Sequence, residues 1–179
     1  MEIVNDPYQK KIIRIYGLFG LSLLLSLVPN IPAACVSAAL GLGVLVIAYV
    51  LRTGAEENSL LENHMTFIIR TIWIGSFFAM LAMFAASFYL LKTIDNTPLN
   101  PCIEKFLAMG AVLDMSNPES LMGIFSNCWA AYWSANMKAF IGGGVIAAGP
   151  VLFYFIVRYA RGLSRAIRGY RVSNPRTWF

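Results

Sequence analysis

Residues 12–51 read IIRIYGLFGLSLLLSLVPNIPAACVSAALGLGVLVIAYVL, two apolar runs joined by a short connection that contains two prolines. Each run approaches the length of about 20 residues that a helix needs to cross the hydrocarbon core of a bilayer. Because hydrocarbon offers the backbone no hydrogen bonds, both runs are predicted to be helices. Only residues 29–32 separate them, so we expect an antiparallel hairpin. The start has the layout of a secretory signal, but Pro32 stands where the cleavage motif has an aliphatic residue, and we expect the segment to be retained.

The whole chain has the composition of a membrane protein. Of its 179 residues, 58% are apolar and 13% are charged, whereas soluble domains carry about a quarter charged residues. Four segments are long and apolar enough to span a bilayer, at residues 12–28, 33–51, 67–91 and 137–157. No repeat or flexible linker divides the chain. We therefore expect one all-α membrane domain, residues 1–179, with four transmembrane helices.

Lys and Arg are distributed unevenly around these predicted spans. They precede the first span, follow the second and form a basic tail at residues 158–179. Because cytoplasmic flanks collect Lys and Arg, we expect both termini in the cytoplasm. Residues 92–136 then form an extra-cytoplasmic insertion. Arg70 lies in the first turn of a span that starts near residue 67, where its guanidinium can reach the interface or pair with a glutamate of the preceding loop (Glu56, Glu57 or Glu62).

The extra-cytoplasmic insertion ends in an aromatic segment. Asn117, Pro118 and Glu119 have the residue types that begin a helix. The aromatic residues that follow are Phe125, Trp129, Tyr132 and Trp133. They are expected either to lie at the membrane interface or to dock on a second membrane subunit. Cys102 and Cys128 also lie in the insertion, which faces an oxidising compartment if the membrane is a bacterial inner membrane, so they are a candidate disulfide.

Small residues recur on single faces of the predicted spans. In the third and fourth spans they are Gly75, Ala79, Ala82 and Ala86, and Gly143 with Ala147; Ser37 with Gly41 is the corresponding pair in the second span. Such faces allow helix backbones to approach closely, within this chain or with another. Pro150 is expected to kink the fourth span, because proline removes a helix hydrogen bond.

The basic tail carries four arginines at spacings of three, four and three, which place them on one helical face: Arg158, Arg161, Arg165 and Arg168. Anionic phospholipids are the expected partner, at about 1 kcal/mol per residue. Nucleic acid is a weaker explanation, because the cytoplasmic bias already accounts for the charge. Asn174 and Pro175 are expected to end the helix and to return Trp178 to the interface.

No catalytic, cofactor or metal site is predicted. The sequence has no phosphate-binding glycine motif and no Cys/His set with metal spacing. The lone His64 has no second ligand or chain of titratable groups with which to bind haem or carry protons. We therefore expect a protein that is not an enzyme.

Two motifs carry a resemblance to a known family. ENHMTFIIRTIWIG, residues 62–75, precedes one span, and VRYARGLSRAIRGYRVSNPRTWF, residues 157–179, follows the last. The matching residues are His64, Arg70, Thr71, Trp73, Gly75, Arg158, Gly162, Asn174, Pro175 and Trp178. Together they resemble a family of small four-helix proteins of the bacterial inner membrane, which is similar to the four-helix component of the chloroplast inner-envelope protein-import apparatus. Residues 92–136 depart from that pattern.

Two functions follow as hypotheses. The chain is expected to be a non-catalytic subunit or accessory scaffold of a larger membrane assembly, such as a secretion, respiratory or photosynthetic complex. Its partners would be other membrane subunits. The alternative, implied by the resemblance, is a channel or protein-translocation component, although spans without charge disfavour selective ion conduction.

Overall fold

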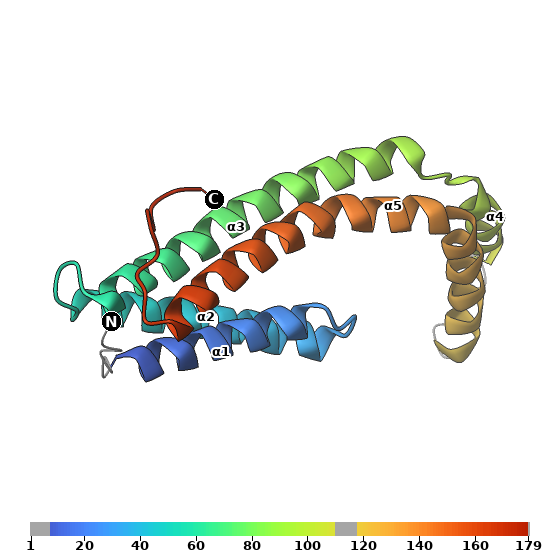
Figure 1. Ribbon diagram of the computed structural model, residues 1–179. Helices are drawn as coiled ribbons and strands as arrows, with labels where there is room; N and C mark the ends of the chain where they lie inside the picture. Colours follow the sequence, from blue (N-terminus) through green and yellow to red (C-terminus); the bar gives the residue numbers. More distant parts are fainter. Residues whose placement is uncertain (1–7, 110–117, 179) are drawn as a thin grey trace. The chain divides into compact units, whose positions relative to one another are not determined.

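The protein is represented by a computed structural model that describes residues 8–109 and 118–178; side chains at 106, 108, 109 and 118–125 lie outside the description. Its elements are α1 (Gln9–Ser26), α2 (Ile31–Thr53), α3 (Leu60–Thr93), the 3₁₀ helix η1 (Thr97–Leu99), α4 (Asn100–Met109) and α5 (Pro118–Ile167) (Figure 1). The described residues contain no strand. They form two compact units. The first comprises residues 1–79 and 151–179, and the second comprises residues 80–150. Because α3 and α5 both cross this division, each contributes to both units.

Three helices are long and apolar enough to cross a membrane, namely α2, α3 and residues 126–167 of α5. They contain three of the four predicted spans and indicate a multi-pass membrane protein. Their large apolar side chains are widely exposed; Phe84, for example, is 75% exposed. Helix α1 is not among the three, and its 18 residues include three basic ones. A fourth span at α1 therefore stays a prediction.

The α1–α2 pair forms the expected antiparallel hairpin, and two serines join its helices. The Ser22 hydroxyl donates to the Ser37 carbonyl oxygen over 3.0 Å, and the Ser37 hydroxyl donates to the Ser22 carbonyl oxygen over 2.8 Å. Gly41 lies next to this pair, where a Cβ atom would be 3.3 Å from Ser22 Oγ. The small-residue face predicted on the second span therefore packs within this chain.

Helices α1 and α5 meet through two tyrosines that each cover a glycine of the other helix. Tyr16 of α1 lies over Gly162 of α5, and Tyr159 of α5 lies over Gly20 of α1; a Cβ atom on either glycine would overlap the tyrosine. The two rings lie edge to face with centroids 6.2 Å apart. Tyr16 belongs to the core of the first unit, so this contact fixes α1 against α5.

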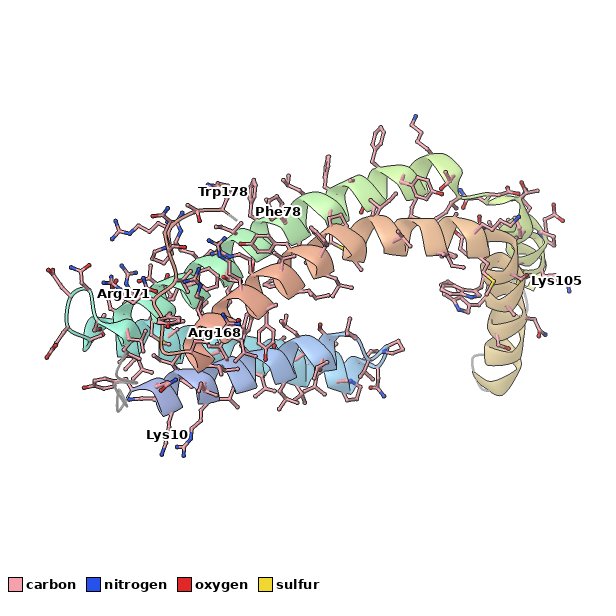
Figure 2. All side chains as sticks on the ribbon, viewed as in Figure 1. Lys10, Phe78, Lys105, Arg168, Arg171 and Trp178 are labelled. Atoms are coloured by element: carbon pink, nitrogen blue, oxygen red, sulfur yellow. A yellow bond between two sulfur atoms is a disulfide. The ribbon has the colours of Figure 1, made fainter. Side chains whose placement is uncertain are left out.

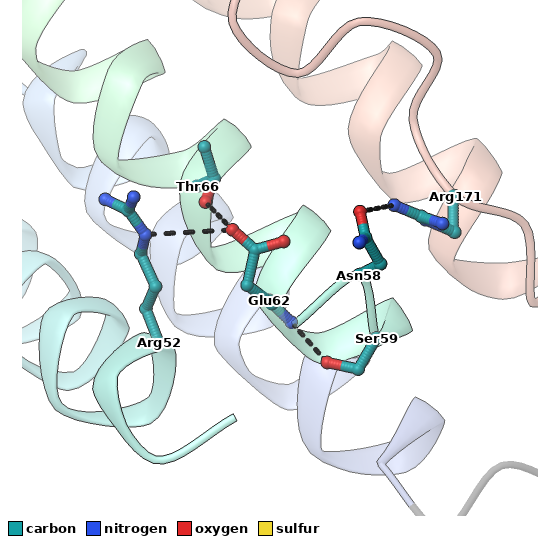
Figure 3. A network of polar contacts seen from close by, with 6 residues as sticks. All are labelled: Arg52, Asn58, Ser59, Glu62, Thr66 and Arg171. Carbon is teal, nitrogen blue, oxygen red and sulfur yellow. Dashed lines mark hydrogen bonds and ion pairs between the residues drawn. The ribbon is translucent and has the colours of Figure 1, made fainter. Parts of the chain in front are cut away.

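Helix α3 begins at Leu60, seven residues before Phe67, where the span was predicted to start. Ser59 precedes it, and its hydroxyl accepts a hydrogen bond from the Glu62 backbone N–H over 3.1 Å, which caps the helix. Figure 3 shows Glu62 also accepting from the Thr66 hydroxyl, at 2.9 Å, and pairing with Arg52 of α2, at 3.9 Å. Arg70 therefore lies in the third turn of α3, and the place of that turn in the membrane stays a prediction. Of the two arginines, Arg52 is the one that pairs with Glu62.

Helix α5 is one helix of 50 residues that joins the predicted aromatic helix to the predicted fourth span. It ends at Ile167 because Gly169 takes a positive φ of 69°. The N–H groups of Gly169 and Tyr170 then bind the carbonyl oxygens of Ala166 and Arg165, over 3.1 and 2.9 Å, which is the Schellman arrangement. The expected stop at Asn174 and Pro175 is therefore wrong, and those residues belong to a non-helical tail.

In the second unit, Asn136 of α5 holds the chain that follows α3. Its side-chain amide donates to the Asp95 carbonyl oxygen (2.9 Å) and accepts from the Asp95 N–H (2.7 Å). The same amide donates to the Tyr132 carbonyl oxygen (3.1 Å), and side chains that enter the helix ladder in this way cause bends. Figure 1 shows α5 bending sharply near this stretch. Pro150, the predicted kink, lies at the boundary between the units, and its kink stays a prediction.

Candidate functional site

The non-helical tail after α5 is held along α3 by paired hydrogen bonds. The Asn63 amide donates to the Val172 carbonyl oxygen over 3.1 Å, and Asn63 Oδ1 accepts from the Val172 N–H over 2.8 Å. Both residues are buried. Farther along, the Trp178 ring lies edge to face with Phe77 and Phe78, at centroid distances of 6.4 and 6.2 Å. Figure 1 shows the tail lying along α3, and we call residues 168–178 the tail strap.

His64 links the tail strap to α1 from the centre of the core. Its Nε2 lies 3.1 Å from the Tyr170 carbonyl oxygen, and its Nδ1 lies 3.1 Å from the Tyr16 hydroxyl. A carbonyl oxygen can only accept, so Nε2 carries the proton of the neutral ring and Nδ1 accepts from Tyr16. His64 is fully buried. His64 therefore joins its own helix α3 to α1 and to the tail strap. Both of its ring nitrogens have hydrogen-bond partners within the protein.

Arg158 is the buried cation of the site, with 1% of its surface exposed. Its Nε donates to the Thr71 hydroxyl over 3.1 Å, and its Nη1 donates to the Thr177 carbonyl oxygen of the tail strap over 3.0 Å. The guanidinium carbon lies 4.0 Å from the Phe67 ring centroid, a cation–π contact. Within the part of the chain that the structure describes, the only ion pair joins Arg52 to Glu62. Arg158 is thus stabilised by hydroxyl, carbonyl and ring rather than by a carboxylate.

Two other arginines lie near Arg158. Arg70 and Arg161 are near enough to interact with it electrostatically. Nη2 of Arg158 and Nε of Arg70 are buried and have no hydrogen-bond partner within the described ranges. Because these like charges repel, contacts that attract the positive charge of Arg158 stabilise the site. The face of the Phe67 ring provides one such contact.

A polar pocket of about 500 Å³ opens beside the tail strap and α3. Its lining residues are Asn58, Glu62, Asn63, Thr66, Arg171, Asn174, Pro175, Arg176 and Thr177. Figure 3 shows Arg171 donating to Asn58 Oδ1 at one side of it, over 3.4 Å. Glu62 is the acidic side chain of this lining, and its carboxylate is already bonded to Thr66 and Arg52. No group of three or more His, Cys, Asp or Glu side chains that could hold a metal occurs among the residues described.

The predicted partner-binding aromatics gather on α5 in the second unit. The rings of Trp133 and Phe140 are stacked, with centroids 4.5 Å apart. A straight helix separates residues seven apart by about 10 Å along its axis, so the bend near Asn136 brings the two rings together. Trp129 is 54% exposed and Trp133 is 45% exposed. Tyr132 joins the group through contacts of its ring with Trp129 and Phe140, at 6.1 and 6.0 Å; we call these four residues the aromatic cluster. The Phe125 side chain lies outside the described residues.

The predicted helix-packing residues lie mainly at buried positions. Gly75 is covered by the Phe155 ring in the first unit, and in the second a Cβ atom on Gly143 would be 3.0 Å from Leu90. The positions that expose little surface are Gly75, Ala82, Ala86 and Gly143, whereas Ala79 and Ala147 are half-buried. Small side chains at these positions permit close helix contact within each unit.

The four arginines predicted to form one lipid-binding face separate into two groups. Arg161, Arg165 and Arg168 are exposed, but Arg158 is buried between α3 and the tail strap. The helical spacing predicts a single face for all four arginines. It cannot show that the tail strap covers the first of them, Arg158. Arg158 is therefore too buried to bind a lipid headgroup.

Cys102 and Cys128 are joined by a disulfide in the second unit, with Cα atoms 6.0 Å apart. Cys35 is free and exposed. Near the bridge, the backbone N–H and hydroxyl of Thr97 donate to the Asp95 carboxylate, which lowers the pKa of that carboxyl group. The folded form of this turn is therefore favoured above the ordinary pKa of an aspartate, and the advantage is lost as pH falls through the lowered value.

Comparison with models of known families, with curated proteins and with solved structures found no match. The resemblance to an inner-membrane family stays a prediction. The roles of Asn63, Asn136 and Tyr16 were not predicted from the sequence.

Proposed function

We propose that this chain is a non-catalytic integral membrane subunit or accessory scaffold of a larger bacterial inner-membrane complex, of the secretory, respiratory or photosynthetic kind. The aromatic cluster carries this proposal. Exposed Trp129 and Trp133 offer large rigid surfaces, and tryptophan and tyrosine dominate the energy of protein interfaces. The partner is another membrane subunit that packs on this cluster.

Two attachments constrain the helix that carries the cluster. Asn136, within this stretch, binds the backbone of Asp95, and the Cys102–Cys128 bridge ties α5 to α4 one residue before Trp129. A preformed surface loses less conformational entropy on binding than a mobile one. This rigidity favours a docking role over that of a loop resting at the interface.

The first unit supports a cytoplasmic location for both termini. Gln9 donates to the carbonyl oxygens of Ala166 and Ile167, over 3.2 and 2.8 Å, so the start of α1 lies beside the end of α5. The basic residues on these two segments are Lys10, Lys11, Arg14, Arg161, Arg165 and Arg168. A shared basic end is the pattern expected of a cytoplasmic face.

The proposal is tested by gentle solubilisation followed by mass spectrometry of co-purifying proteins. Wild type should bring down a stoichiometric membrane partner, and a double Trp129→Ala, Trp133→Ala variant should release it. The matched control is Phe84→Ala with Phe88→Ala, which removes two exposed aromatics from α3 in the same unit. Retention of the partner by the tryptophan variant would overturn the proposal. A self-assembled particle that conducts in planar bilayers would favour the translocation alternative instead.

A further inference from the structure

An apolar groove runs between α1 and α5 in the first unit, with a volume of about 450 Å³. It is lined by leucines of both helices, by Phe155, Ile156 and Tyr159, and by the small residues Gly17, Gly20 and Ala160. A Cβ atom on Gly17 would meet nothing within 4 Å, so the groove is open at that glycine. From residue 17 to residue 27 the groove follows α1 for about 15 Å at the rise of an α-helix.

The groove continues toward the end of α5. A second hollow of about 480 Å³ shares Tyr159 and Ala160 with the first and extends past Ile167 to Arg168. On α1, Lys10 precedes Gly17 by seven residues and Arg14 precedes it by three, which places both on the groove side of that helix. Figure 2 shows Lys10 and Arg168 at the same end of the α1–α5 pair. The groove is therefore apolar along its length and basic at one end.

The chemistry of the two ends identifies the occupant. It must be thin and apolar beside the leucines, and it must be negatively charged beside Lys10, Arg14 and Arg168, all of which are exposed. A phospholipid with an anionic headgroup has both properties in one molecule. A helix of a partner subunit could also fill an apolar groove. Such a helix does not in general carry a negatively charged end that would match the basic residues, so a lipid fits this site better.

We propose that this groove binds one anionic phospholipid, with an acyl chain between α1 and α5 and the phosphate group at Lys10, Arg14 and Arg168. The site differs from the arginine face expected from the sequence, because two helices build it and Arg158 takes no part. It rests on the membrane location in the proposed function, but not on the identity of any protein partner.

The first arm of the test fills the groove. Gly17→Leu places a side chain in the groove from a position where an added Cβ atom meets nothing within 4 Å, and Gly43→Leu is the matched control, since the same is true of Gly43 of α2. Delipidated protein is titrated with dioleoyl phosphatidylglycerol or dioleoyl phosphatidylcholine, and bound lipid is counted by native mass spectrometry. Gly17→Leu should weaken binding of both lipids at least tenfold, and Gly43→Leu should bind as wild type.

The second arm removes charge. Lys10→Gln with Arg168→Gln should weaken phosphatidylglycerol binding by about thirtyfold, or roughly fivefold per charge, and leave phosphatidylcholine binding unchanged. Circular dichroism checks that each variant remains helical. Equal binding of the two lipids by wild type, or unaltered binding by Gly17→Leu, would overturn the lipid site. Continued co-purification of a protein partner in either case would leave the proposed function intact, so the two failures are distinguishable.

Discussion

Asn63 and Val172, 109 residues apart, are joined by two hydrogen bonds in which the asparagine side chain substitutes for a neighbouring backbone. The exchange satisfies both the N–H and the carbonyl oxygen of a non-helical residue that is buried in the protein and has few other partners. It is the central attachment of the tail strap. Tyr170 on His64 and Thr177 on Arg158 are the attachments on either side.

Replacing Asn63 by alanine should therefore release the tail strap. Two buried backbone groups of Val172 would lose their partners, and the free energy of unfolding should fall by roughly 2–4 kcal/mol. Hydrogen exchange of the Val172 amide should accelerate, and trypsin should cleave after Arg171 and Arg176 in detergent. Asn96→Ala, at an exposed asparagine, is the control. Slow exchange and resistance to trypsin in the Asn63 variant would show that the strap is held by other contacts.

Arg158→Lys should destabilise the protein although it keeps the charge. A lysine ammonium cannot reach the Thr71 hydroxyl and the Thr177 carbonyl oxygen in the planar geometry of guanidinium, and it loses the flat contact with Phe67. We expect a loss of roughly 1–3 kcal/mol by denaturant titration in detergent micelles. The exposed Arg161→Lys, one turn later, should change stability by less than about 0.5 kcal/mol. Similar losses in the two variants would contradict the role assigned to Arg158.

The contact between α1 and α5 can be tested with two glycines. Gly162→Ala forces Tyr16 away from a position where its hydroxyl binds His64, and we expect a loss of roughly 1–3 kcal/mol. Gly17→Ala adds the same methyl group in open space and should stabilise α1 by about 0.5–1 kcal/mol. Thermal unfolding followed by circular dichroism measures both. Two changes of the same sign would rule out close packing at Gly162.

Cysteine chemistry distinguishes the bridge from the free thiol. Of the three cysteines, only Cys35 should react with a maleimide before reduction, and all three should react afterwards. Reduction, or Cys102→Ser, should destabilise the second unit by about 3 kcal/mol, as expected for a bridge with a separation of 26 residues. The Cys35→Ser variant serves as control. Three reactive thiols in the unreduced protein would refute the pairing.

Long apolar runs in the sequence predict the four long helices, and three of these helices are long and apolar enough to cross a membrane. The prolines at 29 and 32 also indicate the hairpin, since α2 begins at Ile31. Two helix ends were misplaced although the signals were present. Ser59 and Glu62 have the sequence spacing of a capping box, and the Ser59 hydroxyl caps α3; Gly169 supplies the left-handed residue that ends α5.

The candidate site could not be predicted in the same way, because its polar residues bind backbone groups far along the chain. Asn63 and Asn136 have no local pattern that distinguishes them from surface asparagines. Arg158 has the spacing of an exposed basic face, and only the arrival of the tail strap buries it. Contacts between residues so far apart in the sequence cannot be predicted from its periodicity or its composition.

The contact of Gln9 with the end of α5 spans 157 residues. A ribosome delivers the first hairpin to the membrane long before residues 158–178 leave its exit tunnel. During that interval Tyr16 and His64 lack their neighbours in α5 and the tail strap, so the first unit closes only after residues 158–178 have emerged. Chains stalled before this stage would present those polar groups uncovered, a difference that quality-control proteases could recognise.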